Sequence, residues 1–106
     1  MGLSFKENCP DLRNTRVIDL VTEFESLKCN VDIYDPWVDR EEAYLEYGVR
    51  LCEEPRNKYY DAIVLAVAHE QFIALGADGI RKLTKPDSVI YDLKYILSYE
   101  DSDLRL

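Results

Sequence analysis

The sequence predicts an α/β fold, in which an open and mostly parallel sheet is flanked by helices in three layers. Strand-like and helix-like segments alternate along all 106 residues, the order that characterises this class. Residues 62–68 (AIVLAVA) form a continuous apolar run of strand length, typical of a strand covered by helices on both faces. Because crossovers between parallel strands are right-handed, these elements fit one sheet, and we expect a single domain over residues 1–106.

The first three segments are expected to be a strand, a helix and a strand. Residues 1–5 (MGLSF) are apolar from the first position and indicate the tail of a strand whose start lies outside this chain. Apolar side chains at helical spacing follow, and Asn14 or Thr15 is suited to cap their helix. These side chains are Val17, Leu20, Val21, Phe24 and Leu27. Residues 31–34 (VDIY) predict a short strand that ends before Pro36, because proline lacks an amide donor.

A second helix and a third short strand come next. Asp39 and Glu42 have the spacing of a capping box, in which the aspartate accepts from a free amide of the first turn. The helix is expected to continue to about Tyr47 and to end at Gly48, which adopts the left-handed conformation without steric cost. Residues 49–51 then predict a small strand.

The last third of the chain surrounds the central apolar run. Residues 70–75 predict one or two helical turns ended by Gly76, and residues 78–83 predict another short helix that is broken before Pro86. Residues 88–91 (SVIY) are the last predicted strand. The whole order of elements is that of a Rossmann-like open sheet with an α/β/α arrangement.

Composition excludes several classes of function. The formal net charge is −8, from 13 Lys+Arg and 21 Asp+Glu, which argues against nucleic-acid binding because phosphate neutralisation needs a basic face. No stretch approaches the roughly 20 apolar residues that cross a membrane. Three widely spaced cysteines and one histidine offer few ligands for a metal, and we expect none. With no secretory signal at the start, these features indicate a cytoplasmic protein.

The sheet class directs attention to the residues that follow each strand, because ligands of open parallel sheets bind at the carboxyl ends of the strands. These residues are Lys6, Asp35, His69 and residues 92–94. The loop after the first strand lacks a G-x-G-x-x-G sequence, so an ordinary dinucleotide site is not expected. A lysine at a strand end and Arg13 near a helix start instead favour recognition of a phosphate.

Four stretches carry a resemblance to a known family. Residues 2–15 (GLSFKENCPDLRNT) match the pattern G-[LI]-[AS]-F-K-x(4)-D-x-R-x-[ST], and residues 31–36, 60–72 and 89–94 agree in order. Together they resemble the C-terminal domain of the UDP-glucose/GDP-mannose dehydrogenase family over nearly the whole chain. Residues 7–10 (ENCP) are most similar to bacterial members that oxidise UDP-N-acetylglucosamine or UDP-N-acetylgalactosamine for surface polysaccharides.

The resemblance implies a parent enzyme that uses NAD to oxidise the C6 hydroxyl of a UDP-sugar to a carboxylate, through intermediates bound to a cysteine. The NAD domain and the central catalytic region of such an enzyme are absent from this sequence. We therefore expect the chain alone to be inactive. Its cysteines, Cys9, Cys29 and Cys52, match no catalytic motif and are interpreted as structural or incidental. The parent is expected to form a homodimer or a higher oligomer through the absent central region.

The resemblance also assigns roles to individual residues. Lys6 is expected to bind the UDP-sugar at its diphosphate, and Lys94 to be a second phosphate contact. Arg13 is expected to reach toward NAD, with Asp11 orienting it or bracing the loop. His69 is interpreted as a polar residue at a helix start, because no nucleophile accompanies it in the sequence.

Two alternatives use the same fold. One is a free-standing flavodoxin-like signalling domain, such as a receiver that holds Mg²⁺ with acidic residues at the end of its first strand. Here the first strand ends in Phe5-Lys6, which disfavours that hypothesis. The other is a protein-binding module, which remains open because a fold does not determine a function. Tyr34, Asp35 and Trp37 are further candidates for a ligand face, although an aromatic side chain beside a turn is more often a packing residue.

Overall fold

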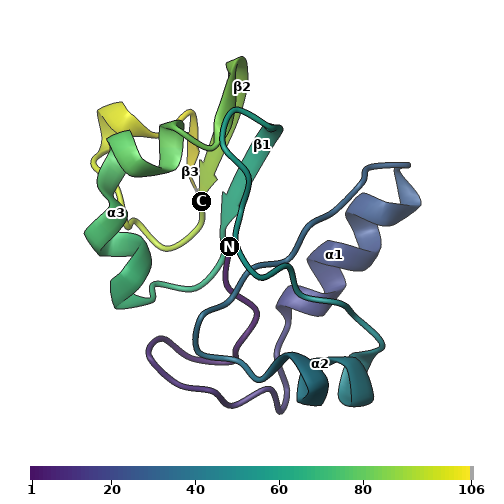
Figure 1. The fold of residues 1–106 in the computed structure, drawn as a ribbon. Helices are drawn as coiled ribbons and strands as arrows, with labels where there is room; N and C mark the ends of the chain where they lie inside the picture. Colours follow the sequence, from purple (N-terminus) through teal and green to yellow (C-terminus); the bar gives the residue numbers. More distant parts are fainter. Residues whose placement is uncertain (106) are drawn as a thin grey trace.

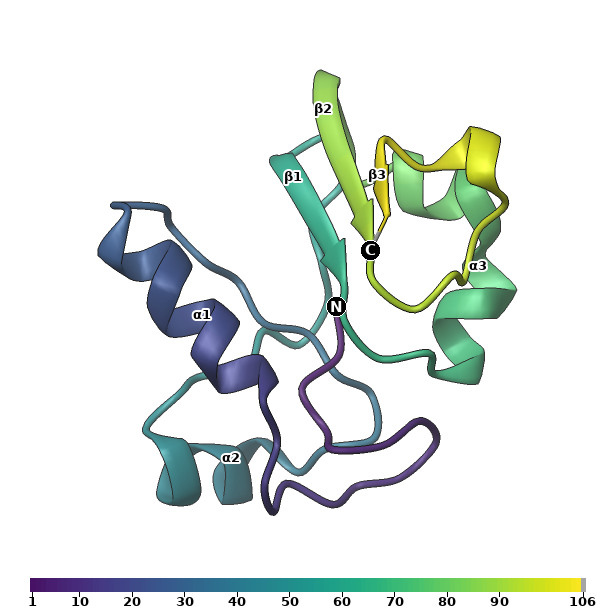
Figure 2. The same ribbon diagram turned by 180° about the vertical axis from the view of Figure 1, so that it is seen from behind.

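The computed structural model describes residues 1–105. Its elements, in chain order, are α1 (Val17–Ser26), α2 (Arg40–Tyr47), β1 (Tyr60–Leu65), α3 (Glu70–Arg81), β2 (Thr84–Asp92), the short 3₁₀ helix η1 (Tyr99–Asp101) and β3 (Leu104–Arg105). Helices α1 and α2 lie on one side of the strands and α3 lies on the other, in both views of the ribbon (Figures 1 and 2). The predicted α/β fold with three layers is therefore confirmed.

The regular sheet is parallel throughout, with β2 between β1 and β3. Extended segments continue the sheet beyond β1. Met1 donates to the Val64 carbonyl (2.6 Å) and accepts from the Ala66 amide (2.9 Å), which is the spacing of parallel pairing. The Gly2 amide in turn donates to the Tyr34 carbonyl (2.8 Å).

The outermost pairing of this side joins Ile33 and Leu51 in one parallel bridge. From edge to edge, the order is thus residues 49–51, 31–34, 1–3, β1, β2 and β3. The chain moves outward through the first three segments and then returns to place β1 beside residues 1–3. This reversal is the topological switch point of a doubly wound sheet, where such folds bind their ligands.

The three predicted short strands are extended segments at the predicted places in the sheet, but each pairs through isolated bonds rather than a continuous ladder. Gly2 has a φ of 99°, which turns the backbone out of the extended conformation after a single paired residue. Its Cα hydrogen also faces Val67, and a Cβ built there would lie 2.7 Å from the Val67 Cβ. Close approach of this segment to the end of β1 therefore requires glycine.

The boundaries of the later strands also differ from the prediction. β1 begins at Tyr60 and ends at Leu65, so it starts two residues before the predicted apolar run and ends three residues before the end of that run. β2 begins at Thr84 and includes Pro86, which we expected to lie before the strand. The register shifts between Tyr60 and Ala62, so residues 85–88 bulge from the ladder, where a proline is tolerated. β3 was not predicted.

The helices follow the prediction closely, with one difference at a cap. Asp39 accepts from the Glu42 amide, and Gly48 is left-handed, as predicted. Gly76 interrupts α3 with a φ of 66°, which confirms the predicted break. The N-cap of α1 is Arg16, rather than Asn14 or Thr15, although the Thr15 hydroxyl still accepts from the first helical amide at 3.3 Å.

Two hydrophobic clusters lie on the two faces of the sheet. The cluster beneath α1 and α2 consists of Leu3, Leu12, Val21, Ile33, Val38, Ala43 and Leu51. The cluster beneath α3 consists of Ile63, Leu65, Ile80, Leu83, Ile90 and Leu97. Each cluster packs the helices of one layer against the sheet. No helix within residues 1–105 is long and apolar enough to cross a membrane.

Candidate functional site

A cleft of about 720 Å³ opens at the topological switch point. Its walls come from the loop after the first extended segment, from the start of α1, from the residues that follow β1, and from the turn that follows β2. The lining residues are Ser4, Phe5, Lys6, Glu7, Thr15, Arg16, Val17, Asp19, Leu20, Glu23, Ala66, Val67, Leu93 and Lys94. The cleft therefore occupies the position at which open α/β sheets bind ligands.

Lys6 and Lys94 both line this cleft, although 88 residues of sequence separate them (94 − 6). Both side chains are exposed. Within residues 1–105, neither ammonium group forms an ion pair with a carboxylate. The start of α1 adds the partial positive charge of a helix N-terminus to the same wall. This arrangement suits an anion that carries two negative groups.

Acidic side chains also line the cleft, at Glu7, Asp19 and Glu23. Asp19 is paired with Arg16 at 3.3 Å, across one turn of α1. Both members of this pair are strongly exposed, so it contributes little stability. The pair nevertheless engages one carboxylate of the cleft with a local cation.

The turn that carries Lys94 is built on Asp92, whose side chain is fully buried at the end of β2. The Asp92 carboxylate accepts from the backbone amides of Lys94 (3.2 Å), Ile96 (3.1 Å) and Leu97 (2.8 Å). Three charge-assisted hydrogen bonds to one carboxylate fix the path of the turn. The position of Lys94 at the cleft is thus set by the residue two places before it.

The loop that carries Lys6 is held by Asp35, at the end of the neighbouring extended segment. The Asp35 Oδ2 accepts from the amides of Leu3 (2.7 Å) and Ser4 (2.9 Å). On the other side of the same segment, the Thr15 hydroxyl donates to the Leu3 carbonyl (2.6 Å). These bonds direct the chain from the sheet into the cleft.

Asp35 also contacts His69, and both side chains are completely buried. The His69 Nε2 lies 2.9 Å from the Asp35 Oδ2, and the His69 Nδ1 accepts from the Asn8 amide at 2.9 Å. Since Nδ1 accepts, Nε2 carries the proton and donates to Asp35. Burial alone would raise the pKa of the Asp35 carboxyl, but hydrogen bonds from His69 and from three backbone amides hold that pKa below its usual value.

The structure places His69 at the N-cap position of α3, as the sequence predicted. Its side chain, however, makes no bond to the free amides of that helix. It points instead to Asp35 and to the loop of Lys6. Sequence reasoning missed this contact, because 34 residues separate the two partners and no local spacing connects them.

Arg13 and Asp11 form a pair outside the lining of the cleft. The Arg13 Nε and Nη2 atoms each donate to an Asp11 carboxylate oxygen at 3.1 Å, and the Arg13 amide donates at 2.9 Å. These bonds from Arg13 lower the pKa of the Asp11 carboxyl. The Arg13 side chain is 84% exposed, so it faces solvent with an orientation that Asp11 determines.

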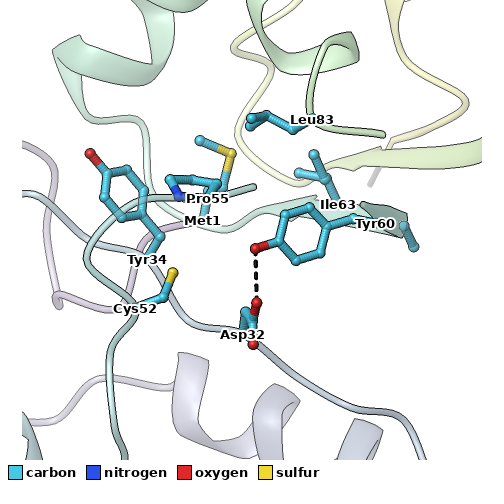
Figure 3. A pocket seen from close by; sticks show the side chains of 9 residues that line it. Met1, Asp32, Tyr34, Cys52, Pro55, Tyr60, Ile63 and Leu83 are labelled. Carbon is cyan, nitrogen blue, oxygen red and sulfur yellow. Dashed lines mark hydrogen bonds between the residues drawn. The ribbon is translucent and has the colours of Figure 1, made fainter. Parts of the chain in front are cut away.

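A second, smaller pocket of about 50 Å³ lies toward the amino end of β1 (Figure 3). In it the Tyr60 hydroxyl donates to Asp32 at 2.8 Å, and burial together with this bond raises the pKa of Tyr60 to about 12. Burial likewise raises the pKa of the Cys52 thiol. The Tyr60 hydroxyl and the Cys52 thiol are therefore protonated at neutral pH. Among the described residues, no lysine or arginine lines this pocket, so it offers no cationic side chain to an anion.

The remaining sequence candidates pack within the structure. The Trp37 indole donates to Gln71 at 2.8 Å and lies 6.3 Å from the His69 ring. The Tyr34 ring lies 6.0 Å from Phe72. All three cysteines are free. Within residues 1–105, no group of three or more His, Cys, Asp or Glu side chains is arranged to hold a metal ion.

Comparisons with known proteins identify the family of this chain. The sequence profile of the UDP-glucose/GDP-mannose dehydrogenase family, UDP binding domain, matches residues 1–99. The chain is 55% identical to UDP-N-acetyl-D-glucosamine 6-dehydrogenase of Pseudomonas aeruginosa and 53% identical to that of Salmonella typhi, in each case over 106 residues. It is 36% identical over 101 residues to Protein CapL of Staphylococcus aureus. The full chain covers 25% of the first two relatives.

Proposed function

Because this chain belongs to the UDP-glucose/GDP-mannose dehydrogenase family and matches its UDP binding domain, we propose that it binds the UDP part of a nucleotide-sugar substrate. The observation that carries this proposal is the meeting of Lys6 and Lys94 in one cleft at the topological switch point. Each lysine provides a compact positive charge, suited to one phosphate of a diphosphate. The N-terminus of α1 adds the partial positive charge of its helix dipole for the same anion.

The whole protein is proposed to be a UDP-sugar 6-dehydrogenase. Relatives that match the full chain at 53–55% identity carry the name UDP-N-acetyl-D-glucosamine 6-dehydrogenase, which supports a UDP-N-acetylhexosamine as the substrate. Its C6 hydroxyl would be oxidised to a carboxylate for polysaccharide biosynthesis. In this proposal the protein is cytoplasmic and assembles at least as a homodimer, through regions outside this chain.

NAD is the proposed oxidant and would accept hydride from the sugar. The residues of this chain do not form an NAD site by themselves, since no glycine-rich turn follows the first extended segment. The exposed guanidinium of Arg13, oriented by Asp11, is proposed as one contact with NAD bound elsewhere in the whole protein. The contribution of this chain is to hold the UDP part of the substrate, and we propose no catalytic residue within it.

Two substitutions test the UDP site. We expect Lys6→Ala and Lys94→Ala each to weaken UDP binding by the chain about tenfold, which corresponds to about 1.4 kcal/mol. Neither change should lower the free energy of unfolding by more than about 0.5 kcal/mol, because both side chains are exposed. Binding is measured by calorimetric titration and stability by urea denaturation.

Lys85→Ala is the matched control. This lysine is also exposed, but it pairs with Asp61 at 3.1 Å and does not line the cleft. UDP affinity should be unchanged in this variant. Equal affinities for all three variants and the unchanged chain would contradict the site, and would leave a protein-binding role as the better explanation of the fold.

A further inference from the structure

We propose that His69 is a positioning residue for Lys6, which holds the loop of that lysine in the conformation that binds the UDP diphosphate. The inference rests on the proposed UDP site, and it assigns separate tasks to the two ring nitrogens of one buried side chain. Nε2 bonds to the end of the neighbouring extended segment, and Nδ1 bonds to the loop.

The Nδ1 contact fixes the far side of the loop. His69 accepts from the Asn8 amide at 2.9 Å, and Asn8 returns to the same element, because its Oδ1 accepts from the Glu70 amide at 2.8 Å. Asn8 has a φ of 54°, in the left-handed region that non-glycine residues rarely adopt. The two bonds to the start of α3 hold this backbone conformation two residues after Lys6.

The near side of the loop is fixed by Ser4. Its hydroxyl donates to the Lys6 carbonyl at 2.9 Å and lies 3.2 Å from the His69 Nε2. The backbone of Lys6 is therefore held between Ser4 and Asn8, and His69 contacts both. Residues 5–8 are exposed, so no buried side chain within this stretch anchors it. Its order depends on these polar contacts and on the bond from the Phe5 amide to the Asp11 carbonyl (2.8 Å).

A purely structural role for His69 makes a different prediction. In that case, substitution would lower stability without changing UDP binding by the molecules that remain folded. A positioning role predicts that affinity changes with the Nδ1 contact, and that stability changes mainly with the Nε2 contact to the buried Asp35 carboxylate. The two contacts can be removed separately.

His69→Asn and His69→Gln form the matched pair of variants. The asparagine Oδ1 takes the place of Nδ1, so it keeps an acceptor for the Asn8 amide and loses the donor to Asp35. The glutamine Nε2 takes the place of the ring Nε2, so it keeps that donor and loses the acceptor. We expect UDP to bind about tenfold more weakly to His69→Gln, and within about twofold of the unchanged chain to His69→Asn, in titrations followed by NMR. His69→Asn should be the less stable variant in urea.

A double-mutant cycle makes the assignment specific to Lys6, because residues that act through one another are not additive. The His69→Gln change should weaken UDP binding much less in a Lys6→Ala background than in the unchanged chain. In a Lys94→Ala background it should retain its full effect. Asn8→Gly, which keeps the left-handed backbone but loses the bond to Glu70, provides a variant outside the buried pair. It should weaken UDP binding about threefold without loss of stability.

The outcomes separate this inference from the proposed function. UDP binding by the unchanged chain, with equal binding by His69→Gln and Asn8→Gly, would overturn the positioning role and leave the UDP site standing. Additive effects of His69→Gln and Lys6→Ala would also overturn it. Absence of UDP binding by the unchanged chain would overturn both proposals.

Discussion

Two buried aspartates support the two sides of the cleft, and they do so in different ways. Asp35 and Asp92 each stand at the end of an extended segment, and each accepts from three backbone amides. Within residues 1–105, the Asp92 side chain accepts from amides that lie two to five places after it. Two of the amides bound by Asp35, and its histidine partner, lie 31–34 residues away. The Lys94 side is therefore folded locally, whereas the Lys6 side depends on distant parts of the chain.

The largest expected effect is the loss of the long-range aspartate. Asp35→Ala should lower the free energy of unfolding by about 3–5 kcal/mol, because it removes a buried carboxylate that satisfies three amides and a buried histidine. Urea denaturation measures the change. A loss below about 1 kcal/mol would show that the segments joined by Asp35 are held by other contacts.

Asp92→Ala should cost less, about 2 kcal/mol, because its amide partners lie in one short turn, where Lys94 is exposed and Ile96 is partly exposed, and no buried histidine loses its partner. Amide hydrogen exchange should become faster in residues 93–97 and remain unchanged around Lys6. Faster exchange at Lys6 as well would contradict the separation between the two sides of the cleft.

The stability of the chain should also depend on pH, through the extended segment that precedes the loop of Lys6. When the chain is produced with Met1 as its first residue, the Met1 amino group lies within the sheet, and burial lowers its pKa from 8.0 to about 6. As pH falls, the unfolded chain takes up this proton near pH 8 and the folded chain only near pH 6. The free energy of unfolding is therefore highest above pH 8 and decreases as pH falls toward 6. Unfolding at pH 6 should require about 2 kcal/mol less than at pH 8.5.

The Nα-acetylated chain is the control for this pH dependence. It keeps an N–H group for the Val64 carbonyl but has no titrating amine. Its stability should change by less than about 1 kcal/mol over the same interval. A slope that persists after acetylation would assign the pH dependence to another group.

Arg13→Ala should have the smallest effect. Its side chain is largely exposed and pairs only with a neighbour in the same loop, so stability should change by less than about 0.5 kcal/mol. UDP affinity of the chain should not change. In the whole enzyme, the substitution should raise the KM for NAD more than the KM for the UDP-sugar, and an unchanged KM for NAD would reject the proposed contact.

The same contrast explains what the sequence could predict. The layered fold, the three helices and the break at Gly76 follow from apolar spacing and capping residues, which are local signals. The placement of Lys6 and Lys94 at the ends of strands also follows from this pattern. The bond from His69 to Asp35 joins distant segments of the chain. Distant contacts also determine why three extended segments form isolated pairings. The spacing of apolar residues does not reveal such contacts. Within residues 1–105, the strand β3 comprises two residues, too few for any pattern.

The central claim is that Lys6 and Lys94 together form a site for UDP. The most direct measurement is an NMR titration of the isotopically labelled chain with UDP, with AMP as the control nucleotide. We predict UDP-selective shifts of the backbone amides of Lys6, Lys94 and the first turn of α1, with little change around Tyr60 in the pocket of Figure 3. Absence of shifts with UDP, or equal shifts with AMP at the same amides, would contradict the account.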